Sequence, residues 1–218
     1  MRTAIFADVH GNLPALETFL SATQGRVDAY FNLGDTVGYG PWPDACVTRV
    51  RQLCGEMMIE GNHERLHLGT DDLSLQLPLV QKFYAVLASR CQNLYAITGL
   101  PRHLDFAGYR CQHAAPLAPD EGAYLVGHSH RQGQDPHHPR VFHVGSIGQC
   151  RTAINRAEWL ELDTETGQFE AYSIPYPFAA FLDTLRSFQY PAECVAYYTG
   201  KPRGNPHASH AADSRPPE

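Results

Sequence analysis

The stretch Phe6-Ala7-Asp8-Val9-His10-Gly11-Asn12 decides the fold, because an apolar run ends there in a carboxylate and an imidazole two residues apart. Residues 3–6 predict a short buried strand, and the following Gly11-Asn12-Leu13-Pro14 predicts a turn into a helix. Asp8 and His10 are therefore expected at the carboxyl end of a strand, the edge of an open α/β sheet where ligands bind. Taken alone, the pair indicates a metal site only weakly, since a polar strand end with a capping aspartate has the same sequence pattern.

The same pattern recurs along the chain at a constant interval. Asp35 follows a second apolar strand at 28–33, and Asn62 follows a third at 57–59. Asp35 lies 27 positions after Asp8, and Asn62 lies 27 positions after Asp35, close to the roughly 30 residues of a βαβ unit. Parallel strands joined by right-handed crossovers would bring the three side chains to one edge. The interval therefore favours a metal centre over unrelated surface polar residues.

Three histidines also follow predicted strands. His113 ends a strand at 109–112, and His128 and His130 follow a strand at 123–126. Two residues apart in an extended chain, the rings of His128 and His130 would project to the same side, each offering a nitrogen to a metal. A set of Asp, Asn and His suits Mn²⁺, Fe or Zn²⁺ better than Mg²⁺ or Ca²⁺, which prefer oxygen ligands alone.

The remaining chain predicts amphipathic helices and closing strands. Helical spacing of apolar residues occurs at 13–20, 46–54, 80–91 and 178–188, and strands at 141–147, 159–162 and 169–174 favour an antiparallel closing ladder. We expect a single domain over residues 1–200. Residues 201–218 contain four prolines and no apolar residue larger than alanine, so we expect a disordered C-terminal tail.

Composition limits the classes of partner. The net charge of −6 over 218 residues argues against bulk nucleic-acid binding, and no apolar run reaches the roughly 18 residues of a membrane span. We expect a cytoplasmic protein with a small-molecule substrate and no membrane partner; the sequence does not predict an oligomeric state. Six scattered cysteines without a Cys-x-x-Cys pair predict reduced packing residues and no disulfide framework.

A resemblance to the calcineurin-like metallophosphoesterase superfamily is carried by Asp8-Val9-His10-Gly11-Asn12, Gly34-Asp35, Gly61-Asn62-His63-Glu64, His113 and Gly127-His128-Ser129-His130. It covers residues 1 to about 175, and the segment from Gly34 to Pro41 resembles a bacterial phosphodiesterase branch. The resemblance implies an α/β (α+β) fold, a four-layer αββα sandwich of two mixed β-sheets flanked by helices.

The resemblance also implies a dinuclear metal site. Asp8, His10 and His130 would hold one ion, Asn62, His113 and His128 the other, and Asp35 would bridge them. Two such ions, roughly 3.5–4 Å apart, hold a hydroxide that attacks phosphorus, so no protein nucleophile is needed. His63 would be the catalytic histidine, giving a proton to the leaving group.

Two departures from the family affect the substrate side. Only eleven residues separate Ala114-Ala115-Pro116 from His128, which predicts a more open wall. Gly38-Tyr39-Gly40 occupies the segment where the protein phosphatase branch has an arginine that clamps a phosphomonoester. Its absence favours diesters and makes Tyr39 and Trp42 candidates for stacking on a substrate ring. The alternative for Trp42 is a partly buried loop anchor.

The resulting functional expectation is a dimetal-dependent phosphohydrolase, a phosphodiesterase acting on small phosphodiesters or nucleotides. The alternative within the enzymes is a phosphomonoesterase or protein phosphatase. The alternative of another class is a non-catalytic interaction module on the same fold, against which the intact ligand set and His63 argue.

Overall fold

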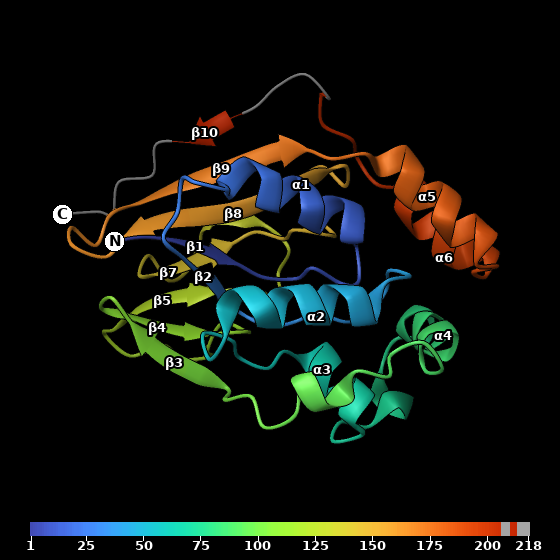
Figure 1. Cartoon of the computed structure of the whole chain (residues 1–218). Helices are drawn as coiled ribbons and strands as arrows, with labels where there is room; N and C mark the ends of the chain where they lie inside the picture. Colours follow the sequence, from blue (N-terminus) through green and yellow to red (C-terminus); the bar gives the residue numbers. More distant parts are fainter. Residues whose placement is uncertain (206–209, 213–218) are drawn as a thin grey trace.

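Two five-stranded mixed β-sheets lie face to face in the computed structural model, which describes residues 1–205 and 210–212 (Figure 1). Sheet A contains, in spatial order, β10 (His210–Ala212), β9 (Phe169–Pro175), β8 (Arg156–Asp163), β1 (Arg2–Phe6) and β2 (Ala29–Asn32). β1 and β2 are parallel, and the other neighbours are antiparallel. The predicted parallel start is present, and β8 and β9 form an antiparallel ladder as predicted. The strand predicted at 141–147 does not join this ladder, because it belongs to the other sheet.

Sheet B has three parallel strands in its centre and an antiparallel strand at each edge. Its spatial order is β3 (His103–Phe106), β4 (Tyr109–Gln112), β5 (Ala123–Val126), β7 (Val141–Val144) and β6 (Gln132–Gln134). β4, β5 and β7 are parallel, while β3 and β6 run against their neighbours. The prediction of two mixed sheets is confirmed.

Six α-helices flank the sheets in the described part of the chain. They are α1 (Leu13–Thr23), α2 (Pro43–Cys54), α3 (Asn62–Leu68), α4 (Pro78–Leu87), α5 (Phe178–Ser187) and α6 (Ala192–Thr199), with short 3₁₀ turns at Leu73–Leu75 and Leu94–Ala96. The Asn12 side chain caps α1 by accepting from the Ala15 amide at 3.2 Å, with Pro14 in the first turn. None of these helices is both long and apolar enough to cross a bilayer.

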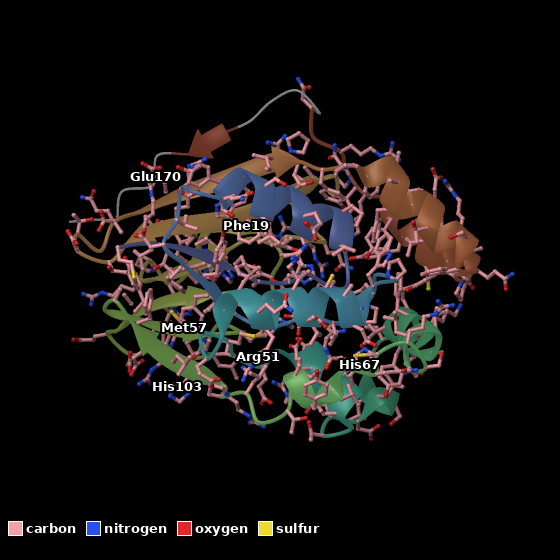
Figure 2. The ribbon with its side chains drawn as sticks, viewed as in Figure 1. Phe19, Arg51, Met57, His67, His103 and Glu170 are labelled. Carbon is pink, nitrogen blue, oxygen red and sulfur yellow. The ribbon has the colours of Figure 1, made fainter. Side chains whose placement is uncertain are left out.

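Alternation along β1 divides the core into two layers. Ala4 and Phe6 face the helices, and Ile5 faces sheet B, where it packs in one cluster with Leu125. On the helical side Phe19 of α1, labelled in Figure 2, lies 4.8 Å from the Phe6 ring and 5.3 Å from the Trp159 ring. This packing fixes β1, and hence the turn that begins at Asp8, in the middle of the fold.

Loops connect the strands of sheet B in the described part of the chain. In the described residues no helix occurs between β3 and β9, and the link from β4 to β5 is a loop whose Ala115 packs against Tyr124, Val126 and Val141. The segment after His113 is too short for a helix and its two turns. A loop therefore packs on part of the outer face of sheet B.

Several local predictions are refined. Residues 57–59 form a single bridge, Asn32 to Met58, in place of a third full strand, and the helix predicted to 91 ends at Leu87. All six cysteines are free and buried, as predicted.

The predicted disordered tail lies in part outside the described residues. Within them, the Gly204 amide donates to the Asn155 side chain at 2.8 Å, and β10 pairs with β9. These described parts of 201–218 lie against sheet A; the prediction for the remainder of the tail falls outside the described residues.

Candidate metal centre

Strand register brings the predicted ligands to one edge of the sandwich. In sheet A the Asp8 amide donates to the Gly34 carbonyl and the His10 amide to the Asp35 carbonyl, each at 3.0 Å, so the turns after β1 and β2 run side by side. In sheet B the Gly127 amide donates to the His113 carbonyl at 2.9 Å. The His128 amide donates to Asp8 Oδ2 at 2.9 Å, which joins the two sheets at the site.

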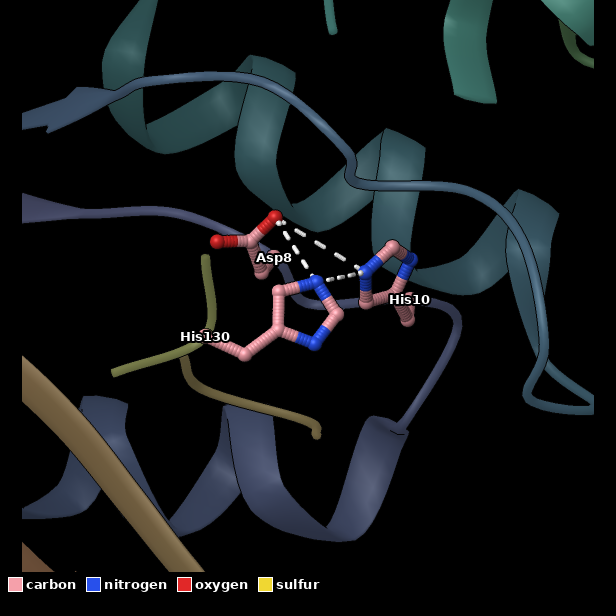
Figure 3. Close-up of side chains that lie close together, drawn as sticks. All are labelled: Asp8, His10 and His130. Carbon is pink, nitrogen blue, oxygen red and sulfur yellow. Dashed lines mark hydrogen bonds and ion pairs between the residues drawn. The ribbon is translucent and has the colours of Figure 1, made fainter. Parts of the chain in front are cut away.

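One group of ligand atoms contains Asp8, His10 and His130 (Figure 3). The two Nε2 atoms of His10 and His130 are 3.0 Å apart. Asp8 Oδ1 lies 3.4 Å from His130 Nε2 and 3.7 Å from His10 Nε2. These are the three residues predicted to hold the first ion.

A second group contains Asn62, His113 and His128. Asn62 Oδ1 lies 3.1 Å from His113 Nε2 and 2.9 Å from His128 Nδ1. Asp35 Oδ2 lies 3.2 Å from His113 Nε2 and 3.8 Å from His10 Nε2, so its carboxylate stands between the two groups. The structure thus brings all seven predicted ligand residues together at one edge of the sandwich.

The outward-facing ring nitrogens set the histidine tautomers. Nδ1 of His10, His113 and His130 lies 3.1, 2.8 and 3.1 Å from a backbone carbonyl oxygen. Because a carbonyl only accepts, each Nδ1 carries the hydrogen, and Nε2 of each ring is the nitrogen that faces the centre. Burial, aided by the charges of His130 and His63, lowers the pKa of His10 well below its usual value, which favours the neutral ring.

The donor set fits divalent cations. Asp8 Oδ1 is fully buried and accepts no hydrogen bond among the described residues, an expensive state for a carboxylate oxygen. The Nε2 atoms of His10 and His130 cannot bond to each other when both rings are neutral, although they are 3.0 Å apart. A cation would satisfy all three atoms, and carboxylate, amide and imidazole ligands suit Mn, Fe or Zn.

Five of the ligand residues have a left-handed backbone conformation, which sets the direction of their side chains. Asp8, His10, Asp35, His128 and His130 all have φ between 50° and 64°, in a region that costs an L-residue roughly 1–2 kcal/mol. Asp and His tolerate this region better than bulky residues do. His128 and His130 therefore converge through a tight turn and not, as the sequence predicted, through an extended chain. The packed sheets and the hydrogen bonds of the site hold this conformation in place.

A model of the calcineurin-like phosphoesterase family matches residues 1–131. The chain belongs to this family. It is accordingly a phosphoester hydrolase of a family that uses divalent metals. An uncharacterized protein of Methanocaldococcus jannaschii is 27% identical over 213 residues, covering 79% of this chain and 87% of that relative.

Solved structures share the fold. A metallophosphoesterase from Sphaerobacter thermophilus matches with a TM-score of 0.75 at 24% identity, over 91% of this chain and 98% of its own. A hypothetical protein from Pyrococcus horikoshii gives 0.73 at 20% identity, over 90% and 97%. A putative diadenosine tetraphosphatase gives 0.59 at 18% identity, over 80% and 93%. At these identities the likeness establishes the shared fold.

His63 of this phosphoesterase lies beside the ligands. Its amide donates to Asp35 Oδ1 at 2.8 Å, and a ring nitrogen lies within 4.8 Å of the ligand atoms of His10 and Asp35. The ring forms no hydrogen bond within the described residues. A Cβ at Gly38 would overlap the His63 ring, which explains the glycine there. Burial lowers the pKa of His63, while the Asp35 charge opposes that shift.

Tyr39 and Trp42 occupy different places from those predicted for substrate stacking. Tyr39 is 9% exposed, and its ring lies 4.8 Å from the His10 ring and 4.7 Å from the His63 ring. This enclosure favours a role in holding the two histidines. Trp42 is half-buried at the start of α2, with its ring 6.3 Å from Phe181, which favours the loop-anchor alternative.

An open pocket of about 390 Å³ adjoins the second ligand group. It is lined by Asn62, His113 and His128 of that group and by Glu60, Arg65, Arg102, His103, Gln112 and Ala114. His103, labelled in Figure 2, is the first residue of β3. Ala114 is the first residue of the short loop after His113, the loop from which a more open wall was predicted. The pocket beside this loop is large enough for a small substrate.

Glu64 is a positioning residue to which the sequence analysis assigned no role. Its Oε2 accepts from the amides of Asp35 at 2.7 Å and Gly61 at 2.8 Å, and its Oε1 accepts from Thr36 at 2.7 Å and Val37 at 3.2 Å. The carboxylate therefore fixes the turn that carries Asp35 to the start of α3. The sequence did contain a pattern that indicates this role, because Glu64 stands three residues after Gly61, the N-cap of the helix, where a glutamate commonly accepts from backbone amides.

We expect Glu64→Gln to lower the free energy of unfolding by about 2–5 kcal/mol, because an NH₂ group would replace an oxygen that accepts from two buried amides. Urea unfolding measures the change. The control is Glu193→Gln, an exposed partner of Lys82, for which we expect less than about 1 kcal/mol. Equal changes in the two variants would show that Glu64 does not anchor the site.

Proposed function

We propose that this phosphoesterase is a phosphodiesterase that hydrolyses small phosphodiesters or nucleotides with the help of two divalent metal ions. The observation that carries the proposal is the convergence of seven ligand side chains at one edge of the sandwich, with His63 beside them. One of them, Asp8, has a buried oxygen that accepts no hydrogen bond in the described residues. An interaction module would have no use for this arrangement, whose unpaired polar atoms and left-handed turns reduce stability.

Each part of the site has a defined task. Asp8, His10 and His130 would hold one ion, Asn62, His113 and His128 the other, and Asp35 would be shared. The bound ions supply Lewis-acid stabilisation of the phosphoryl oxygens and an activated water as nucleophile. Tyr39 and Gly38 keep the His63 ring in place, and His63 would give a proton to the departing oxygen. The pocket beside Asn62, His113 and His128 would receive the part of the substrate that leaves.

The preference for diesters rests on charge. The turn at 38–40 carries no cation, and the Gly38 backbone faces His63 at the position where a phosphatase of the family would place its arginine. A monoester at neutral pH carries about two negative charges and a diester one, so the missing guanidinium penalises the monoester more. Phosphomonoesterase activity remains the second candidate because Arg151 lies near enough to Tyr39 for its charge to act there.

We expect the metal-loaded enzyme to have a higher kcat/KM for bis-p-nitrophenyl phosphate than for p-nitrophenyl phosphate, after each value is divided by the uncatalysed hydrolysis rate. Tyr39 is too enclosed to be replaced by arginine, so the informative variant is Arg151→Gln. A wild type that prefers the monoester, and loses that preference in Arg151→Gln, would establish the phosphatase alternative.

A further inference from the structure

Within the described residues, two arginines beside the first ligand group are unusual because their side chains have no partner. Arg131 directly follows His130, and the Arg151 amide donates to the His130 carbonyl at 2.9 Å. Every other arginine within residues 1–205 forms an ion pair, a hydrogen bond or a ring contact through its side chain. In a chain of net charge −6, two free guanidinium groups next to a metal ligand are a local departure from the general charge balance.

A lysine that contacts Tyr197 adds a third positive charge. Lys201 Nζ lies 4.7 Å from the centre of the Tyr197 ring, and no acidic partner for it occurs in the described residues. Tyr197 is stacked on Tyr39 at 6.2 Å with an angle of 12° between the rings, and Tyr39 contacts His10. The lysine is thus connected to the metal centre through two stacked tyrosines.

Arg131 and Arg151 flank His130, and their charges act on Lys201. Partial burial, followed by the charges of Arg151 and Arg131, lowers the pKa of Lys201. Arg151 also acts on the hydroxyls of Tyr39 and Tyr197, opposing the rise in pKa that burial causes there. Like charges that act on one another, with no ion-pair partner in the described residues, repel, so a bound anion would stabilise the surface.

We infer that Arg131, Arg151 and Lys201 form an anion subsite that binds a second phosphoryl group of the substrate, separate from the phosphodiester that is cleaved. This inference rests on the proposed phosphodiesterase function. Arginine forks match phosphoryl oxygens bidentately, and lysine adds a point charge. The guanidinium groups belong to residues that flank His130 and are exposed, whereas the scissile group must reach the buried ligand atoms. The substrate class is therefore a small nucleotide diester that carries an additional phosphate.

The test compares two substrates that differ in one phosphate. They are thymidine 5′-(p-nitrophenyl phosphate) and the same compound with a 3′-phosphate, and release of p-nitrophenolate reports cleavage of the same bond in both. We expect the wild type to favour the phosphorylated substrate by about tenfold in kcat/KM, and the double variant Arg131→Gln/Arg151→Gln to bring this ratio close to one. The control Arg186→Gln removes an exposed arginine paired within α5 and should keep the wild-type ratio.

Binding is measured in parallel, so that the subsite is tested whether or not the diester is cleaved. Calorimetry on the metal-loaded protein compares thymidine 3′,5′-bisphosphate with thymidine 5′-monophosphate, and we expect the bisphosphate to bind about tenfold more tightly in the wild type only. No release of p-nitrophenolate from either compound would reject the phosphodiesterase proposal. Equal kcat/KM values, or equal affinities for the two nucleotides, would overturn the subsite.

Discussion

Replacing Asp35 with asparagine is expected to weaken the binding of both metal ions. Its Oδ2 lies 3.2 Å from His113 Nε2 and 3.8 Å from His10 Nε2, so the same carboxylate faces both ligand groups. Asparagine keeps an oxygen that can accept from the His63 amide, which isolates the loss of charge. Removing an outer partner of a ligand already costs about 10–100-fold in metal affinity, so the loss of a shared ligand should exceed about 100-fold.

Elemental analysis after dialysis against a defined free metal concentration measures this effect. We expect about two ions per wild-type chain, fewer than one in Asp35→Asn, and about one in the matched variant Asp8→Asn, since Asp8 belongs to a single group. Asp105→Asn, at an exposed ion pair on β3, should retain the wild-type content. Identical losses in Asp35→Asn and Asp8→Asn would contradict a shared carboxylate, and a wild type with only trace metal would contradict the dinuclear site.

Strand spacing was sufficient to predict which residues meet. The constant interval from Asp8 through Asp35 to Asn62 reflects a repeated strand and crossover, and the registers of β1 with β2 and of β4 with β5 place the following residues side by side. This follows because parallel strands must end at the same edge whatever the loops do. The position of Asn62 was also predicted from this interval, although residues 57–59 make only one bridge. That bridge aligns Met58 with Asn32 and so places the segment parallel to β2.

The geometry of the ligands could not be predicted in the same way. Asp8, His10 and His130 adopt left-handed φ values of 50° to 56°. Asp and His tolerate such values, but their positions in the sequence do not require them, and contacts of the folded chain such as the His128 amide with Asp8 Oδ2 help to hold them. For the same reason Tyr39, with a φ of 46°, is turned inward against His10 and His63 and away from a substrate-stacking position.

The free arginines were missed for a different reason. Arg131 and Arg151 are twenty residues apart, and only the loop contact from the Arg151 amide to the His130 carbonyl brings them to one place. Their lack of an ion-pair partner within the described residues is a property of the folded surface, since acidic residues such as Asp135 and Glu158 are close to them in the sequence. The lack of an arginine at 38–40 therefore gives the charge of that one turn and not of the whole site, because the cations near the site come from other parts of the chain.

His63→Ala is expected to retain the metals and lose turnover in a way that depends on the leaving group. General acid catalysis typically contributes about 10²–10⁴-fold, so a diester with an alkyl leaving group should lose kcat in that range. A p-nitrophenolate leaving group needs no proton, and its loss should be far smaller. The structure supports this assignment because the His63 ring lies next to His10 and Asp35 yet has no hydrogen-bond partner within the described residues.

The matched control is His67→Ala, a buried histidine one turn further along α3, labelled in Figure 2, whose ring packs 4.9 Å from Tyr84. This variant removes an imidazole from the same helix but none of the metal ligands. The ratio of kcat for the alkyl leaving group to kcat for p-nitrophenolate should therefore stay at the wild-type value. Added imidazole should partly restore alkyl-ester hydrolysis in His63→Ala, because the deleted ring leaves a space beside Tyr39 and Gly38. If both leaving groups lose the same factor and imidazole restores neither, His63 positions the ligands and does not donate the proton.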